Sequence, residues 1–142
     1  MASYFIKIMF TTKENGDFEF SNARRNIWGT VDVDVTIAKT GKAVRFTASP
    51  DDSEEYGRQL YDQLNTTYSS EVAECPESER DTAFASMARG DRNSRFKNTD
   101  WTQNSDVPEA TRSLWAPYRQ ALRDVPSQVG FPYEISWPVP PS

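Results

Sequence analysis

The 142-residue sequence contains no histidine and a single cysteine, Cys75. Without histidine, the paired ligands that usually hold zinc and other transition metals are missing, and one cysteine cannot form an internal disulfide. No imidazole is present to activate the Cys75 thiol, so we interpret it as an unpaired thiol without a catalytic role. The sequence also has no glycine-rich phosphate loop. We therefore expect no metal, no other cofactor and no enzymatic activity.

Long apolar runs and an excess of positive charge are also missing. No run approaches the roughly 20 apolar residues that cross a bilayer, and Met1–Phe10 lacks the cationic start and the small-residue cleavage site of a signal peptide. The formal net charge is -5, whereas nucleic-acid binding needs Lys and Arg clustered on one face. We therefore expect a cytoplasmic protein with neither a membrane nor a nucleic acid as partner.

Aromatic side chains are plentiful beside a small apolar fraction. Hydrophobic residues make up 37% of the chain and aromatic residues 13%. Each ring can bury on the order of 150–250 Å², so much of the buried apolar area must come from rings. Rings in such number beside a thin core often serve a protein interface.

Residues 1–72 are predicted to form a small α+β domain, beginning with an antiparallel sheet. In Tyr4–Phe10 the even positions form one apolar face with period two, and Asn15-Gly16 favours a tight turn before a returning strand at Phe18–Phe20. Val31–Ile37 alternates in the same way, and Val44–Ala48 returns after a polar turn. The pattern predicts two hairpins with one solvated face.

A helix is predicted to pack on the dry face of this sheet. Pro50–Ser53 precedes it, and Asp or Ser there can cap free backbone N–H groups. Glu54 and Glu55 then favour the positive end of the helix. A helix of about four turns would be roughly 24 Å long. Its apolar face comprises Tyr56, Leu60, Tyr61, Leu64 and Tyr68.

Residues 73–107 are interpreted as a polar linker, and residues 108–142 as a C-terminal arm. The linker contains a short helix around Ser78–Arg89 that is expected to stop at Gly90–Asn93. The arm begins with a helix between Pro108 and Pro126. The apolar face of that helix comprises Leu114, Tyr118, Ala121, Leu122 and Val125.

Proline shapes the rest of the arm. Pro117 removes a backbone hydrogen bond inside the predicted helix, at a cost of roughly 3 kcal/mol, so we expect a kink or a restart there. The Pro- and Trp-rich tail Phe131–Pro141 cannot form a helix and is predicted to be extended. The fold class is therefore α+β, with a helical and extended arm after the sheet domain.

Two groups of acidic residues could be taken for ion ligands. Asp32 and Asp34 alternate along a strand, which is typical of a solvated face. Asp51, Asp52 and Glu54 precede a helix, which is typical of caps. A calcium site needs six or more oxygens around one ion, so we favour the structural interpretation. A small hydrolase using paired carboxylates remains an alternative, although nothing in the sequence selects a pair.

Three motifs in the last third of the chain carry a resemblance to a known family. They are Asp100-Trp101-Thr102-Gln103, the run Trp115–Asp124 (Trp-Ala-Pro-Tyr-Arg-Gln-Ala-Leu-Arg-Asp), and the closing pairs Phe131-Pro132 and Trp137-Pro138. From about Arg92 to Pro141 the sequence resembles the C-terminal region of bacteriophage tail fibre assembly proteins, also called tail assembly chaperones. Phe46–Asp52 and Tyr56–Tyr61 resemble an N-terminal module of many of the same proteins.

The resemblance implies a tail fibre assembly chaperone. Such a protein binds the C-terminal region of a tail fibre subunit, covers its apolar surface and helps it to trimerise. It would act in the host cytoplasm during assembly. A structural protein retained on the fibre or baseplate of the virion is the alternative, and baseplate or other virion proteins are then further partners.

Partner binding is assigned to aromatic and arginine side chains of the resembling region. Arg119 and Arg123 are four residues apart on one helical face. They form a solvated stripe if the region is a lone domain, whereas in an interaction arm their guanidinium groups suit the carboxylates or carbonyls of a partner. The rings are assigned because large aromatic side chains often anchor interfaces. The predicted partner-binding residues are Trp101, Trp115, Tyr118, Arg119, Arg123, Phe131 and Trp137.

Overall fold

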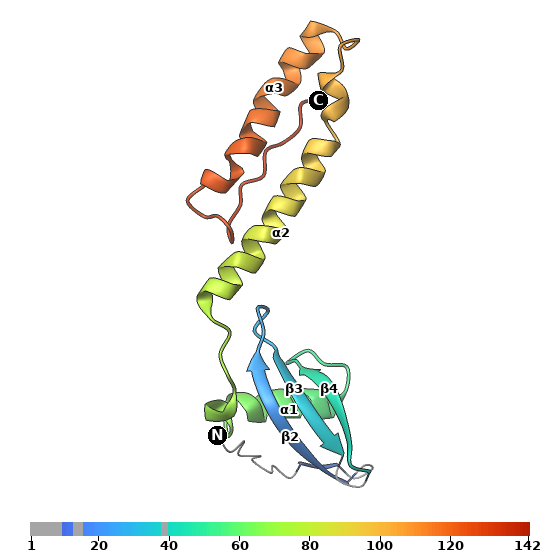
Figure 1. The fold of residues 1–142 in the computed structure, drawn as a ribbon, viewed down its shortest axis with the longest axis vertical. Coiled ribbons are helices and arrows are strands. Elements are labelled where there is room, and N and C mark those ends of the chain that lie inside the picture. Colours follow the sequence, from blue (N-terminus) through green and yellow to red (C-terminus); the bar gives the residue numbers. More distant parts are fainter. Residues whose placement is uncertain (1–9, 13–15, 38–39) are drawn as a thin grey trace. The chain divides into compact units, whose positions relative to one another are not determined.

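A computed structural model describes residues 10–12, 16–37 and 40–142 of the chain. The chain divides into two compact units, Met1–Pro76 and Glu77–Ser142. The first contains the strands and one α-helix, and the second contains two further α-helices (Figure 1). The predicted α+β class is confirmed. No helix among the described residues is both long and apolar enough to span a membrane.

The described part of the first unit forms a four-stranded antiparallel sheet in the order β1-β2-β3-β4. Its strands are β1 (Phe10–Thr12), β2 (Gly16–Arg25), β3 (Val31–Ile37) and β4 (Lys42–Ala48). The second predicted hairpin is confirmed by the pairing of β3 with β4, and the first is confirmed only where Phe10 pairs with Phe18. The expectations for 4–9, and for Asn15 and Lys39 within the two turns, lie outside the described residues.

The register of the second hairpin explains the alternating sequence. Val31 pairs with Ala48 and Val33 with Phe46, so their side chains share one face of the sheet. Val31, Val33 and Ala48 are completely buried. Gly41 supplies the positive φ of 63° that the turn requires.

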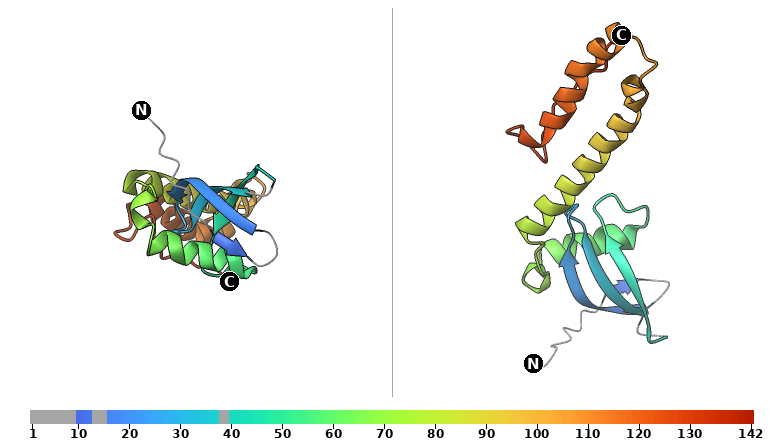
Figure 2. Two further views of the ribbon diagram at one scale, coloured as in Figure 1. Left: turned by 90° about the horizontal axis from the view of Figure 1, so that it is seen from below. Right: turned by 45° about the horizontal axis from the view of Figure 1, so that its top comes forward.

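The helix α1 (Glu55–Asn65) lies across the apolar face of the sheet (Figures 1 and 2). Leu60 and Leu64 are buried in the same cluster as the β3 valines, as the predicted face requires. The helix begins where the Asp52 carboxylate accepts a hydrogen bond of 2.9 Å from the backbone N–H of Glu54. This acid is therefore structural, as predicted.

The helix ends one turn earlier than predicted. Asn65 Nδ2 donates to the Tyr61 carbonyl, and Thr66 Oγ1 donates to the Asp62 carbonyl. Such local side-chain bonds compete with helix continuation. Tyr68 then precedes the short 3-10 helix η1 (Ser69–Glu71), and its ring still packs edge-on against Phe20 at 5.6 Å.

The second unit contradicts the predicted linker. Residues Glu77–Lys97 form one continuous helix of 21 residues, α2, with no stop at Gly90. One glycine costs a helix only about 1 kcal/mol, and the Asp91–Arg95 pair spans the same turn at 3.5 Å. Acidic residues occupy the first turn and basic residues the last, which complements the helix dipole.

The helix α3 (Glu109–Asp124) lies beside α2 in both views (Figures 1 and 2). Tyr118 and Leu122 are buried, as is Val125 in the following 3-10 helix η3 (Val125–Ser127). Leu114, predicted on the same face, is exposed. The helix continues through Pro117, so the predicted restart is absent. The kink stays a prediction.

The C-terminal tail is non-helical, as predicted, but it folds back onto α2. Tyr133 Oη donates to the Asp81 carboxylate, and the Tyr133 ring lies 5.1 Å from that of Phe84. Gln128 closes the turn, because its side-chain amide exchanges two hydrogen bonds with the backbone of Ser136. The tail is therefore part of the packing of the second unit.

Candidate partner-binding surface

Three of the predicted partner-binding rings form one cluster in the second unit. The rings of Trp101 and Trp115 meet edge-on with centroids 5.8 Å apart, and Trp115 meets Tyr118 in the same way at 5.8 Å. Tyr118 is 8% exposed, whereas Trp101 is 49% exposed. Tyr118 therefore supports the cluster from within the fold, and Trp101 offers its ring to solvent.

Trp101 is held by the 3-10 helix η2 (Asp100–Gln103), and Arg119 holds this helix against α3. Arg119 Nη1 donates to Thr99 Oγ1 at 2.7 Å and to Asp100 Oδ1 at 3.1 Å. The buried Thr102 hydroxyl donates to the Thr99 carbonyl at 2.7 Å. These bonds position the exposed Trp101 ring before any partner arrives.

This geometry changes the interpretation of Arg119. Its side chain is only 12% exposed and stacks over the Phe96 ring at 5.1 Å. Its recorded contacts are all internal, so the guanidinium acts first as a structural group that joins α2, η2 and α3. Sequence spacing placed Arg119 and Arg123 on one face but could not reveal that Asp100 and Thr99 approach one of them.

Arg123 has a different environment. It is exposed, its Nη1 donates to Gln120 Oε1 at 3.2 Å, and its guanidinium lies 5.8 Å from the centre of the Phe96 ring. With Arg112 and Arg119 it lines a shallow hollow of about 390 Å³ on the surface of α3 and η2. Arg123 is therefore accessible to a partner.

The two tail rings predicted to bind a partner are engaged with α2. Trp137 lies under the guanidinium of Arg95, 4.3 Å from it, and Phe131 lies 5.4 Å from that of Arg89. Both rings are half-buried. Their partner-binding role stays a prediction, and the contacts described here make them anchors of the tail.

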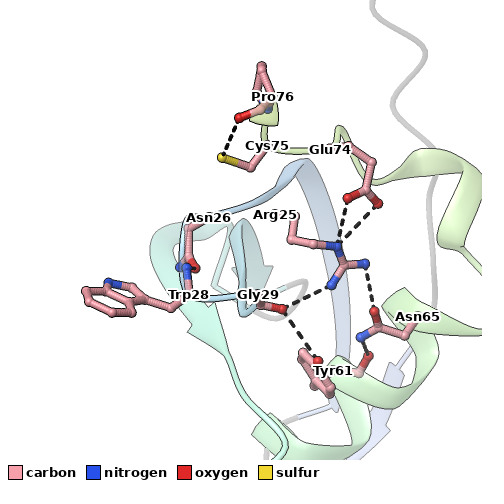
Figure 3. A network of polar contacts seen from close by, with 9 residues as sticks. All are labelled: Arg25, Asn26, Trp28, Gly29, Tyr61, Asn65, Glu74, Cys75 and Pro76. Atoms are coloured by element: carbon pink, nitrogen blue, oxygen red, sulfur yellow. Dashed lines mark hydrogen bonds and ion pairs between the residues drawn. The ribbon is translucent and has the colours of Figure 1, made fainter. Parts of the chain in front are cut away.

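The first unit contains a polar network that the sequence did not suggest. Arg25 bonds to the carboxylate of Glu74 at 3.0 Å, to Asn65 Oδ1 at 2.7 Å and to the carbonyl of Gly29 at 3.1 Å (Figure 3). It thereby ties the end of α1 and the segment after η1 to the β2–β3 turn. Trp28 lies in that turn and is 64% exposed.

Asp32 and Asp34, on the sheet, both accept hydrogen bonds from neighbouring side chains. Asp32 accepts from Asn26 and Thr47, and Asp34 accepts from Asn22 and Arg45. Among the described residues, no group of three or more potential ligands could hold a metal.

Asp34 gives a pH-dependent prediction. The hydrogen bond from Asn22, and then those from Arg45 and its charge, lower the pKa of Asp34. A lowered folded pKa contributes stability above the unfolded pKa of about 3.9, and this contribution is lost as pH falls through the folded value. Asp34→Asn should therefore flatten the loss of stability below about pH 4. Urea unfolding at several pH values checks this, and equal slopes for parent and variant would contradict it.

Cys75 gives a second prediction. Its thiol is buried and unpaired, and its contact with a polar atom is a weak one of 3.7 Å to the Pro76 carbonyl. Cys75→Ser should leave the activity of the protein unchanged, with a loss of stability of at most about 1–2 kcal/mol from burying a hydroxyl. An assembly assay at matched protein stability is the check. Lost activity with unchanged stability would give the thiol a functional role.

The features above define a class of protein. An α+β chain with no metal-binding group among its described residues presents an exposed, preorganised tryptophan beside an arginine-lined hollow, which is typical of a protein-binding module. Residues 85–142 match the family model described as phage tail assembly chaperone protein. The match confirms the resemblance over residues 85–142. It supports a general role in tail assembly and contacts with phage tail proteins.

The matched region contains every predicted partner-binding residue and begins inside α2. The first unit lies outside it, so the resemblance of Phe46–Asp52 and Tyr56–Tyr61 stays a prediction. No curated protein and no solved structure matches the chain.

Proposed function

We propose that this protein is a non-enzymatic chaperone that binds the C-terminal region of a tail fibre subunit in the host cytoplasm and assists its trimerisation. The observation that carries the proposal is the exposed Trp101 ring, held in place by Trp115 and the Arg119 bonds within the matched region. A ring fixed in advance loses little conformational entropy on binding.

The physics of fibre assembly supports this role. A fibre trimer intertwines three chains, so its monomers expose apolar surface and unpaired strand edges before they associate. A half-exposed tryptophan beside accessible guanidinium groups can cover such surface reversibly. Large rings and arginines are the residues that most often carry interface energy.

Pull-down from phage-infected host lysate tests the proposal. The parent chain should capture the tail fibre subunit, and Trp101→Ala should reduce capture at least tenfold, since buried anchor residues contribute about 2 kcal/mol or more. Trp28→Ala is the matched control, because it removes another exposed tryptophan that lies outside the matched region. The proposal is contradicted if neither the parent chain nor the Trp28→Ala control captures the tail fibre subunit.

The same material distinguishes a departing chaperone from a retained virion protein. Mass spectrometry of purified virions should find the fibre subunit without this chain. Detection of the chain at a fixed ratio to the fibre would favour the structural alternative. The pull-down result is needed in both cases, because both alternatives require fibre or baseplate binding.

A further inference from the structure

The three arginines of the hollow on α3 and η2 differ in what neutralises them. Arg112 Nη2 donates to Glu109 Oε2 at 2.9 Å, and Arg119 Nη1 donates to Asp100 Oδ1 at 3.1 Å. Arg123 donates to the neutral amide oxygen of Gln120. Among the described residues, Arg123 is thus the one guanidinium lining this hollow that has no carboxylate within ion-pair distance.

The residues around Arg123 position its guanidinium group without neutralising its charge. The neighbouring acid, Asp124, accepts a hydrogen bond from Gln120 Nε2 at 3.0 Å, and Gln120 in turn accepts from Arg123. The guanidinium also lies over the Phe96 ring, 5.8 Å from its centre. A positioned guanidinium loses less side-chain freedom when it forms a bidentate pair with an incoming carboxylate.

We propose that Arg123 binds an aspartate or glutamate side chain of the tail fibre subunit, an inference that rests on the proposed function. Arg112 and Arg119 each pair with a carboxylate of this chain, which shows that carboxylates suit this surface. Arg123 is left open to a carboxylate of the partner. A nucleic-acid phosphate is a poorer match, because the chain is acidic overall, at -5, and phosphate backbones select rows of unpaired cations.

The helix also sets the spacing of the recognised segment. Trp115, which supports Trp101, lies eight residues before Arg123, which is about 12 Å along the helix axis. An extended chain covers that distance in about four residues. The bound fibre segment should therefore have an apolar side chain against the Trp101–Trp115 ring pair and an acidic one about four residues away.

A peptide titration followed by NMR tests this inference without the fibre. The probe is the blocked peptide Leu-Gly-Ser-Gly-Asp, and its Asn version is the control. The Asp peptide should shift the Arg123 Nε–Hε signal and the Trp101 indole signal, while the Asn peptide should leave Arg123 unmoved. Equal Arg123 shifts with both peptides, no shift at all, or a larger shift with an oligothymidylate would overturn the proposal.

A second arm uses the full chain and the C-terminal fragment of the fibre subunit. Arg123→Gln should weaken binding about tenfold at low salt, and the difference should shrink as salt increases. Arg112→Gln is the matched control, because Glu109 already neutralises Arg112, and it should change affinity less than twofold. If the parent chain binds the fragment and Arg123→Gln binds it equally well, only this inference is wrong. If the parent chain does not bind the fragment, the proposed function is wrong.

Discussion

Replacing Arg119 with alanine is expected to lower the free energy of unfolding of the second unit by about 2–3 kcal/mol. One nearly buried guanidinium holds the Thr99 hydroxyl, the Asp100 carboxylate and, at 3.4 Å, the Phe96 carbonyl. Hydrogen bonds to charged groups contribute about 1.5–3 kcal/mol, and their loss removes this donor from the buried Thr99 hydroxyl. The packing of the side chain on Phe96 is lost as well.

Urea unfolding followed by tryptophan fluorescence measures this effect, because three of the four tryptophans lie in the second unit. Arg123→Ala on the same helix is the control, and it should cost less than about 1 kcal/mol because it is solvated. If both variants lose the same small amount, Arg119 is a solvated side chain and Trp101 is not preorganised by it.

Removing Gly130–Ser142 is expected to destabilise the second unit by about 3 kcal/mol. The tail contributes two cation–π contacts and one ring pair along α2, each of which contributes roughly 0.5–2 kcal/mol. The sheet core of the first unit draws its buried side chains from between Phe20 and Val72. It should therefore keep its protection from hydrogen exchange.

Hydrogen exchange with mass spectrometry separates these effects by segment. Exchange is expected to become faster across α2 and α3 and to stay unchanged across β3. A shorter deletion of Val139–Ser142 is the control, since it spares Trp137 and removes the exposed Val139. Unchanged exchange in α2 after the longer deletion would mean that the tail is a free arm, as the sequence suggested.

The sheet could be predicted because its pattern is local. Alternation in Val31–Ile37 and a turn glycine at Gly41 fix the pairing of β3 with β4, whichever other elements pack on them. The length of α2 could not be predicted in this way. The helix packs against the tail, more than thirty residues further on, and a glycine within the helix gave a misleading stop signal.

The candidate site was predictable by residue type but not by role. The tryptophan and arginine motifs indicated an interface, and Trp101 is accessible as expected. Periodicity treats Arg119 and Arg123 as equivalent, since they lie four residues apart. Only the fold of η2 against α3 makes one a structural group and leaves the other open. Likewise, Tyr118 supports the cluster from inside because its face of α3 is buried.

We propose that this chain assists trimerisation of a tail fibre subunit through the Trp101 surface. Size-exclusion chromatography with light scattering tests it most directly, on the C-terminal fibre fragment expressed alone, with the parent chain and with Trp101→Ala. The fragment should form a soluble trimer with the parent chain and mostly aggregate in the other two cases. An equal yield of trimer from the fragment expressed alone would contradict the proposal.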